Sequence, residues 1–457
     1  MFLPDVVVRS RRVVRPGGTQ PAAIHVRNGR IVGVLDFEDV PTDCPLDDAG
    51  EDVILPGLVD SHVHVNEPDG FDVTTRAAAS GGVTTLVDMP LHSVPVTTTV
   101  AALEAKRESA GGHCFVDVGF WGGVVPGNAR SLASLYEAGV LGFKCILVDA
   151  GVEEFRAVSE HDLRLVMPAL ARIGATLLVH AEWPGPIHDA LTHRSAGQRW
   201  IERIPGLSDR SRYSTYLESR PKAAENEAVA MLIQLCREYR TKTHILHLSS
   251  SDALTPIFHA RTAHLPLTVE TCPHYLCLTA EEIPNGATAF KVAPPIRDRA
   301  NREFLWAALA GGLIQTVVSA HSPPRPATTH ARSAAFATAW DGIGSIQLGL
   351  SIMWTGASAR GYSLDQVARW MCLAPARVAG LSRKGAIDVG YDADLVVLDP
   401  DAAFTVEADG LYPRPISTPY SGHRLRGVVR RTYLRGRRIY ERGKPFPPPT
   451  GQLLARP

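Results

Sequence analysis

Two histidines, His62 and His64, stand one residue apart at the end of an apolar, strand-like stretch of the chain. Side chains two positions apart on a β-strand point to the same face, so the two imidazoles can chelate one divalent metal ion. An isolated pair of this kind is more often a core histidine beside an unrelated one. Here the apolar run 53–55 precedes the pair and a turn beginning at Asn66 follows it. That context is typical of a strand that delivers ligands to the C-terminal mouth of a parallel barrel.

Three further residues that could bind a metal ion lie in other strand-like runs. Lys144 lies inside one such run, His180 ends the next, and His247 lies near the end of a third. A single histidine at a strand end is usually a core or surface residue. Four histidines at the predicted mouths of one barrel instead indicate a site for divalent metal ions.

Lys144 is flanked by the apolar or weakly polar residues Phe143, Cys145 and Ile146. A buried ammonium group is costly without a partner, so either an ion pair or a chemical change must compensate it. Reaction with carbon dioxide would give a carbamate, an anionic ligand with two oxygens that can bridge two metal ions. The four histidines supply no negative charge, which a carbamate would add. The sequence therefore leaves two possibilities for Lys144, a carbamate and a plain salt bridge.

The elements that must position these residues alternate between strand-like and helical patterns, which predicts an α/β fold with a (β/α)8 barrel. The expected strands are 58–65, 84–89, 115–120, 142–147, 176–180, 243–248, 267–271 and 315–319. The expected helices are 99–109, 129–138, 160–173, 223–239, 252–263 and 301–310, with two more at 343–353 and 364–371. Short strands at both chain ends predict one flanking β-sandwich, which gives the domains 1–55, 56–384 and 385–457.

The charge balance argues against some partners. The chain carries 47 Lys and Arg against 47 Asp and Glu, a formal net charge of zero. We therefore expect no nucleic acid and no membrane as a partner. No apolar run approaches the ~18 residues of a membrane span. The seven scattered cysteines indicate reduced thiols and a cytoplasmic location.

Several longer motifs resemble the cyclic amidohydrolases, the family of hydantoinase, dihydropyrimidinase and dihydroorotase, and within it most closely the bacterial allantoinases. The resemblance covers nearly the whole chain. Its motifs are P-G-L-V-D-S-H-V-H-V-N-E-P from Pro56, T-R-A-A-A-S-G-G-V-T-T from Thr75, V-D-V-G-F-W-G-G from Val116, G-F-K-C from Gly142, L-V-H-A-E to Glu182, H-L-S-S-S-D-A from His247, E-T-C-P-H-Y-L from Glu270 and A-P-P-I-R-D to Asp298.

The resemblance implies hydrolysis of an amide bond in a small ring, with a cyclic amide or ureide as substrate. It makes His62 and His64 ligands of one metal ion, His180 and His247 ligands of the other, and N6-carboxylated Lys144 the bridge. Zinc is favoured, with cobalt, iron or manganese as alternatives. It also implies a homodimer or homotetramer. We assign substrate contacts to Asn66, His92, Ala293 and Pro294.

The chain departs from the family at one catalytic position. The family reads S-D-H-S-P after the eighth strand, and its aspartate binds a metal ion and carries a proton to the leaving nitrogen. Here the stretch reads Ser-Ala-His-Ser-Pro, with Ala320 in place of the aspartate and His321 after it. Allantoinases read M-P-L-N where this chain has His92, and the loop 69–73 is shortened.

Three hypotheses follow from these departures. The chain is a cyclic amidohydrolase with an altered substrate or direction, in which His92, His321 or the substrate itself handles the proton. Alternatively, it is a catalytically impaired paralogue that serves as a binding scaffold. The third hypothesis is an inactivated Asp-to-Ala variant of a true allantoinase. Retention of all four histidines and Lys144 argues against the scaffold, which has no need for a complete set of metal ligands.

Overall fold

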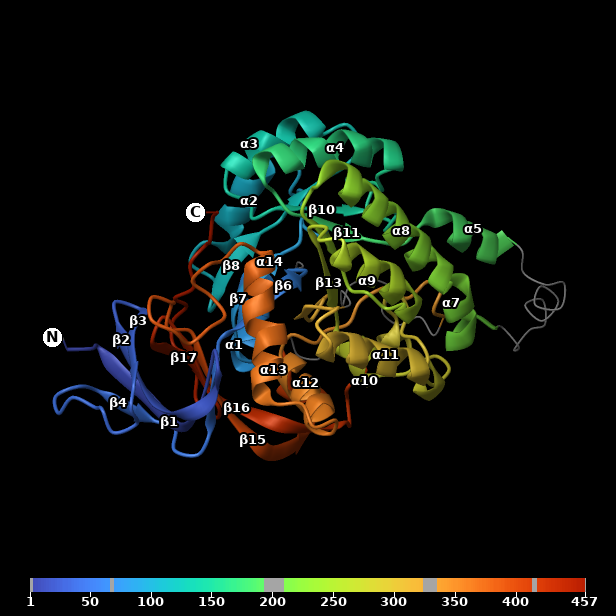
Figure 1. Cartoon of the computed structure of the whole chain (residues 1–457). Coiled ribbons are helices and arrows are strands. Elements are labelled where there is room, and N and C mark those ends of the chain that lie inside the picture. Colours follow the sequence, from blue (N-terminus) through green and yellow to red (C-terminus); the bar gives the residue numbers. More distant parts are fainter. Residues whose placement is uncertain (1–2, 66–69, 193–208, 324–334, 413–416, 457) are drawn as a thin grey trace.

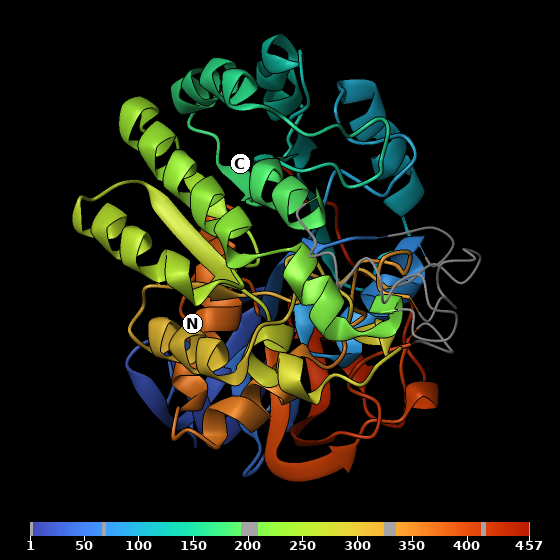
Figure 2. The same ribbon diagram turned by 90° about the vertical axis from the view of Figure 1, so that its right-hand side faces the viewer.

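The computed structural model describes residues 3–65, 70–192, 209–323, 335–412 and 417–456. A ring of parallel strands surrounded by helices forms the larger part of the molecule (Figure 1). Strands from the two chain ends, blue and red in Figure 1, lie side by side next to this ring. Figure 2 shows the same arrangement from a second direction.

The strands of the ring run parallel and follow one another in chain order. One sheet contains β6 (Leu58–Val63), β7 (Val83–Asp88) and β8 (Asp117–Phe120), and the other contains β9 (Gly122–Gly123), β10 (Phe143–Ile146), β11 (Leu177–His180), β12 (Thr243–Ile245), β13 (Leu267–Thr271) and β14 (Thr316–Val317). A bridge between Val63 and His321 links the end of the second sheet back to β6. Within the described residues, the predicted barrel is confirmed.

Helices follow most of the barrel strands and cover them on the outside (Figure 1). They are α1 (Gly70–Ser80), α2 (Val100–Ala110), α3 (Leu132–Glu137), α4 (Glu160–Ile173), α5 (Pro184–Thr192), α7 (Tyr213–Ser219), α8 (Lys222–Tyr239), α9 (Leu254–Thr262), α10 (Pro273–Cys277), α11 (Arg299–Ala310), α12 (Gly349–Ser358), α13 (Leu364–Ala368) and α14 (Ala374–Val378). None of the helices in the described ranges is both long and apolar enough to cross a bilayer.

Helix α4 shows why the predicted bounds are accurate where local signals are strong. Ser159 accepts a hydrogen bond from the backbone N–H of Asp162, whose side chain accepts one from the Ser159 backbone. Gly174 ends the helix with φ of +69°, a conformation that glycine adopts without a steric penalty. The helix therefore begins and ends where the sequence predicts.

The helix expected at 343–353 begins later, at Gly349. The backbone N–H groups of Ser345 and Ile346 donate to Nδ1 of His321, at 3.1 and 3.3 Å. These bonds hold the segment before α12 as an irregular strap against the barrel. The prediction was wrong here because a contact with a residue more than twenty positions away outweighs local helical preference.

Both chain ends contribute to one eight-stranded sheet, which confirms the β-rich domain expected from the two ends. Its order is β17 (Arg437–Glu441), β16 (Arg424–Leu434), β15 (Leu395–Thr405), β5 (Val53–Pro56), β1 (Val6–Arg15), β2 (Gly18–Arg27) and β3 (Arg30–Leu35), with β4 (Leu46–Asp48) beside β1. Strand β5 pairs with β15 on one side and with β1 on the other, so it joins the two ends. The same strand leads directly into β6 and the first histidine pair.

A buried ionic cluster connects this sheet to the barrel. The Nζ atom of Lys384 lies 2.7 Å from Asp117 on β8, 2.7 Å from Asp394 and 3.1 Å from Asp392. Arg435, between β16 and β17, also binds Asp117 at 2.5 Å. The lysine side chain is only 4% exposed. Its positive charge therefore compensates the negative charge of carboxylates that, like the lysine, have little access to water.

We expect Lys384→Met to lower the free energy of unfolding by about 3–5 kcal/mol, because removing one partner of a buried ionic cluster leaves uncompensated carboxylates. Denaturant unfolding at neutral pH measures this loss. Lys444→Met is the matched control, since Lys444 is exposed. Equal stability of the two variants would show that the cluster does not hold the sheet to the barrel.

Candidate active site

The first histidine pair lies at the end of β6, where the barrel mouth opens. His62 and His64 are 2% and 6% exposed, and their ring centres lie 5.5 Å apart. Nδ1 of His62 lies 2.6 Å from Oε1 of Glu270, at the end of β13. Metal-binding histidines commonly donate the N–H of their second ring nitrogen to a carboxylate. With Nδ1 engaged by Glu270, Nε2 is the His62 nitrogen suited to a metal ion.

Glu270 is fully buried and receives two further hydrogen bonds. Nε2 of His244 lies 2.9 Å from its Oε2, and the backbone N–H of His247 donates to its Oε1 at 3.1 Å. Burial by itself would raise the pKa of Glu270, but His62 and these hydrogen bonds lower it to about 2. Burial lowers the pKa of His62 to about 4 despite the attraction of Glu270. The pair is therefore a carboxylate and a neutral imidazole at neutral pH.

The second histidine pair repeats this arrangement on the neighbouring strands. Nδ1 of His180 and Nε2 of His247 face each other at 3.0 Å. Two nitrogens bound to one tetrahedral zinc ion lie about 3.3 Å apart, so the pair has nearly the spacing of two ligands. Nε2 of His180 lies 2.9 Å from Glu182, which also binds Arg220 at 2.5 Å. Burial raises the pKa of Glu182, but Arg220 and His180 lower it to about 2.

Lys144 lies on β10, which pairs with β11, and is 3% exposed. Burial lowers the pKa of its ammonium group to about 7, although Glu270 acts in the opposite direction. The lysine charge in turn lowers the pKa of His62, His64 and His247, which places it among members of both pairs. A substantial fraction of the Lys144 amine is therefore neutral and nucleophilic at neutral pH.

The predicted catalytic residues follow β14. Ala320 has φ of +47°, the left-handed region in which alanine is disfavoured by roughly 1–2 kcal/mol and aspartate or asparagine is found more often. The carbonyl of His321 accepts a hydrogen bond from the backbone N–H of His64 at 2.8 Å. Because Nδ1 of His321 accepts the two strap N–H groups, only its Nε2 remains for chemistry.

The residues predicted to contact the substrate lie in different parts of the structure. The His92 ring centre lies 4.7 Å from that of His64 and 5.2 Å from that of Trp340. The Pro294 carbonyl accepts a hydrogen bond from the Tyr275 hydroxyl at 2.6 Å, so Ala293 and Pro294 lie against α10, just beyond β13. Asn66 is outside the described residues.

Sequence reasoning assigned no role to the two carboxylates that organise the mouth. Asp60 accepts backbone N–H groups from His62 and Ser319, joining β6 to the end of β14. Burial raises the pKa of Asp60 to about 7. Glu270 lies in a quoted motif, and its position at the end of an apolar strand was the signal that could have identified it.

The donor set fits two divalent ions held by two pairs rather than by two preformed triads. Across the described residues, no three His, Cys, Asp or Glu side chains converge as a metal site. Each pair would need a shared bridging ligand, and the resemblance places Ala320 where the family has the aspartate that would complete the first pair. Carboxylated Lys144 would supply the shared ligand. His62 would keep its contact with Glu270, and His180 its contact with Glu182.

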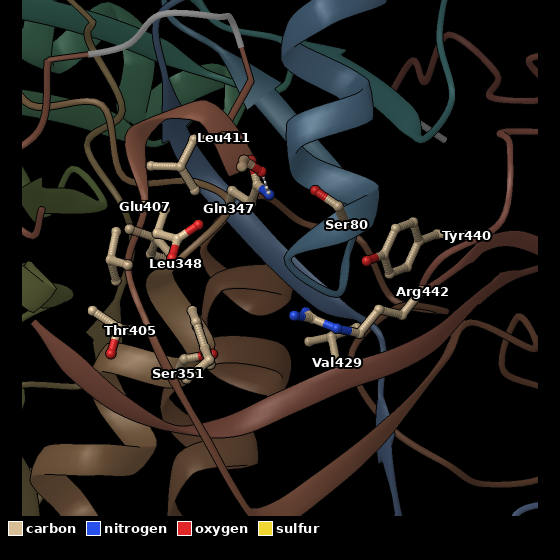
Figure 3. Close-up of a pocket in the computed structure, with 13 residues that line it drawn as sticks. Ser80, Gln347, Leu348, Ser351, Thr405, Glu407, Leu411, Val429, Tyr440 and Arg442 are labelled. Carbon is tan, nitrogen blue, oxygen red and sulfur yellow. Dashed lines mark hydrogen bonds between the residues drawn. The ribbon is translucent and has the colours of Figure 1, made fainter. Parts of the chain in front are cut away.

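A separate pocket of about 350 Å³ lies between α12 and the strands β15 to β17 (Figure 3). Its lining includes Gln347, Glu407 and Arg442 and contains none of the predicted site residues. Figure 3 shows Tyr440 and Arg442 on one side of the pocket and Thr405, Glu407 and Leu411 on the other. The pocket is therefore distinct from the barrel mouth.

The chain belongs to the amidohydrolase family, whose profile matches residues 53–439. It is 48% identical to the allantoinase of Streptomyces avermitilis over 99% of both chains, and 40% identical to that of Saccharomyces cerevisiae over 96% of both. Among solved structures it is similar to the L-hydantoinase (dihydropyrimidinase) of Arthrobacter aurescens, with a TM-score of 0.89, 30% identity, and coverage of 99% of this chain and all of that one. The resemblance inferred from the motifs is confirmed.

We expect Glu182→Gln to reduce the loss of unfolding free energy that the protein undergoes as the pH falls. The pKa of Glu182 in the folded protein, about 2, lies below its ordinary value of 4.5, so its charge stabilises the fold above about pH 5. That contribution, about 2–3 kcal/mol, is lost as the pH falls from about 5 to about 2.

Denaturant unfolding of chelator-treated protein between pH 6 and pH 3 measures the effect. The wild-type chain should lose more stability over this range than the Glu182→Gln variant. Glu137→Gln, at an exposed position on α3, should behave as the wild-type chain does. Parallel profiles for the wild-type chain and Glu182→Gln would contradict the ionised carboxylate assigned to Glu182.

Proposed function

We propose that this chain is a binuclear, metal-dependent cyclic amidohydrolase that opens the ring amide of a small nitrogen heterocycle of the allantoin or hydantoin type. The observation that supports this most directly is the pair of carboxylate-backed histidines, His62 with Glu270 and His180 with Glu182. The full-length similarity to allantoinases favours a ureide ring as the substrate class.

The metal ions, with zinc favoured, would supply a hydroxide nucleophile at neutral pH and polarise the ring carbonyl. His62 and His64 would hold one ion, and His180 and His247 the other. Glu270 and Glu182 fix the orientation of one imidazole in each pair. The neutral amine of Lys144 would attack carbon dioxide, forming a nitrogen–carbon bond and releasing one proton, which leaves an anionic bridge between the pairs.

The proton that the leaving ring nitrogen requires is the unusual part of this site. Ala320 has no group to accept or donate it, and Nδ1 of His321 is occupied by backbone donors. We therefore propose an altered substrate or reaction direction. The second candidate, an Asp-to-Ala variant of a true allantoinase, is favoured by one observation, the left-handed backbone at Ala320, which suits aspartate better than alanine.

We predict that purified protein holds divalent metal and carries one added carbon dioxide on Lys144. Elemental analysis and native mass spectrometry check both statements after growth with zinc and bicarbonate. Lys144→Ala should lose the mass increment and most of the metal, whereas Lys444→Ala should retain both. Metal-free wild-type protein under these conditions would refute the binuclear proposal.

We predict that the wild-type chain hydrolyses allantoin very slowly and that Ala320→Asp raises the rate only slightly, because His92 and the shortened loop of a diverged relative no longer fit allantoin. An increase of about 10²–10⁴-fold, the usual contribution of a general acid–base group, would instead support the Asp-to-Ala variant of a true allantoinase. A steady-state assay of ring opening measures it.

Ala320→Asn is the matched control, because asparagine also suits the left-handed backbone but cannot transfer the proton. A rate increase with asparagine equal to that with aspartate would show that backbone strain, not the missing proton carrier, limits the reaction. Wild-type turnover of allantoin within the usual range of about 1–10³ s⁻¹ would refute the argument from Ala320.

A further inference from the structure

Another cavity, of about 710 Å³, lies between α5, α7 and the segments that contain Lys291 and Asp341. Its volume falls within the usual range of about 300–1,000 Å³ for small-molecule sites. Arg220 in its wall binds Glu182, and Glu182 binds His180, one of the predicted metal ligands. Two hydrogen-bonded side chains therefore connect this cavity to the second histidine pair.

The lining of this cavity carries more positive than negative charge. Its charged side chains are those of Arg210, Arg220, Lys291 and Asp341. Lys291 lies 3.0 Å from Asp341, and Arg220 is paired with Glu182. Arg210 is exposed and has no ion-pair partner in the described part of the chain. The lining therefore has one positive charge left for an anionic ligand.

The guanidinium group of Arg220 is only partly used within the protein. Its Nη1 donates to Glu182 at 2.5 Å, and its other nitrogens have no acceptor among the described residues. The side chain is 17% exposed. A guanidinium group presents its N–H groups as a planar fork that matches the two oxygens of a carboxylate. Arg220 and Arg210 are therefore suited to bind a carboxylate in the cavity.

Asp341 gives the cavity an acceptor for N–H groups. Its Oδ1 lies 3.0 Å from Nζ of Lys291 and 3.4 Å from the Tyr216 hydroxyl, whereas its Oδ2 has no partner within the described ranges. The Phe336 ring stacks on that of Tyr216, and the Phe336 N–H donates to the Arg210 carbonyl at 2.9 Å. These contacts fix the lining before a ligand binds, which lowers the cost of ordering it.

The proposed reaction produces a molecule with matching groups. Ring opening joins the oxygen of water to the carbonyl carbon and breaks the bond from that carbon to the ring nitrogen. One proton of the water goes to the nitrogen, and the other is lost from the new carboxylic acid. A ring of the hydantoin type contains a urea unit. Its open form therefore has a carboxylate at one end and the N–H groups of a ureido group at the other.

We infer that this cavity binds the open-chain ureido acid, with its carboxylate on Arg220 and Arg210 and its ureido N–H groups on Asp341. The choice of ligand rests on the proposed function, because ring opening creates the carboxylate. In the ring-closing direction the same molecule is the substrate. The site distinguishes the acid from the neutral ring, because only the acid carries a charge for the two arginines.

Calorimetric titration of chelator-treated protein with N-carbamoylglycine, a small open-chain ureido acid, tests the inference. The wild-type chain should bind it saturably, and the neutral ring of hydantoin should not displace it. Arg220→Lys keeps a positive charge beside Glu182 but removes the planar fork, and should weaken binding about tenfold. Arg210→Gln should weaken binding about two- to fivefold, as expected for an exposed charge.

Further variants separate specific binding from general attraction of anions. Arg437→Gln, at an exposed position on β17, is the control and should bind as the wild-type chain does. Asp341→Asn should reduce the preference for N-carbamoylglycine over propionate, which has the carboxylate but lacks the ureido group. Arg210→Gln changes an exposed side chain, which covers the case in which Arg220→Lys does not fold.

The outcomes distinguish this inference from the proposed function. Weaker binding by both arginine variants, with unchanged binding by the control, would establish the site. It would be overturned by a wild-type chain that shows no saturable binding, by unchanged affinity in both arginine variants, or by equal affinity for propionate and N-carbamoylglycine. Because the titration uses metal-free protein, a chain that binds no zinc but binds the ureido acid through Arg220 would refute only the binuclear proposal.

Discussion

The buried carboxylate of Glu270 is the constraint on which the barrel mouth depends. It contacts His62 on β6, His244 on β12 and the backbone of His247 while lying on β13 itself. A buried charge costs several kcal/mol unless hydrogen bonds compensate it, so these strands must keep a common register around it. The same contacts give His62 a defined tautomer. The side-chain geometry of one histidine pair is therefore a consequence of charge compensation in the barrel interior.

The sheet from the two chain ends supports the mouth from the opposite direction. Strand β5 lies between β1 and β15 and continues almost directly into β6. Lys384 and Arg435 both bind Asp117 on β8. Strand β8, which pairs with β7, is therefore also attached to that sheet. The first strands of the barrel are thus fixed by a sheet that contributes none of the candidate site residues. Because close-packed protein interiors have low compressibility, the histidine pair stands on a rigid base.

In the family pattern that the motifs resemble, one carboxylate performs two roles. Binding a metal ion requires only a lone pair at the right distance, whereas proton transfer requires a group that can both accept and donate at neutral pH. Under the proposed function, the methyl side chain of Ala320 could perform neither role, and metal binding would depend on the two histidine pairs and Lys144. Under that proposal, metal content and turnover are expected to vary independently.

The sequence by itself determined the features that depend on local pattern. Alternation of apolar runs with helical periodicity predicted the barrel, and strands and helices mostly fall within a few residues of their expected bounds, as in α4. The one-residue spacing of His62 and His64 predicted that they share a face, and the apolar neighbours of Lys144 predicted a perturbed ammonium group, which the structure shows as a pKa near 7.

Only the tertiary structure decided which distant residues meet. The pairing of Glu270 with His62 and the approach of His92 to His64 each join segments that follow or lie on different strands, and the strap from Ser345 to His321 joins residues 24 positions apart. Spacing along the chain says nothing about such contacts, because closing the barrel brings them together. The late start of α12 also has a tertiary cause, because the hydrogen bonds from Ser345 and Ile346 to His321 hold the preceding segment outside the helix.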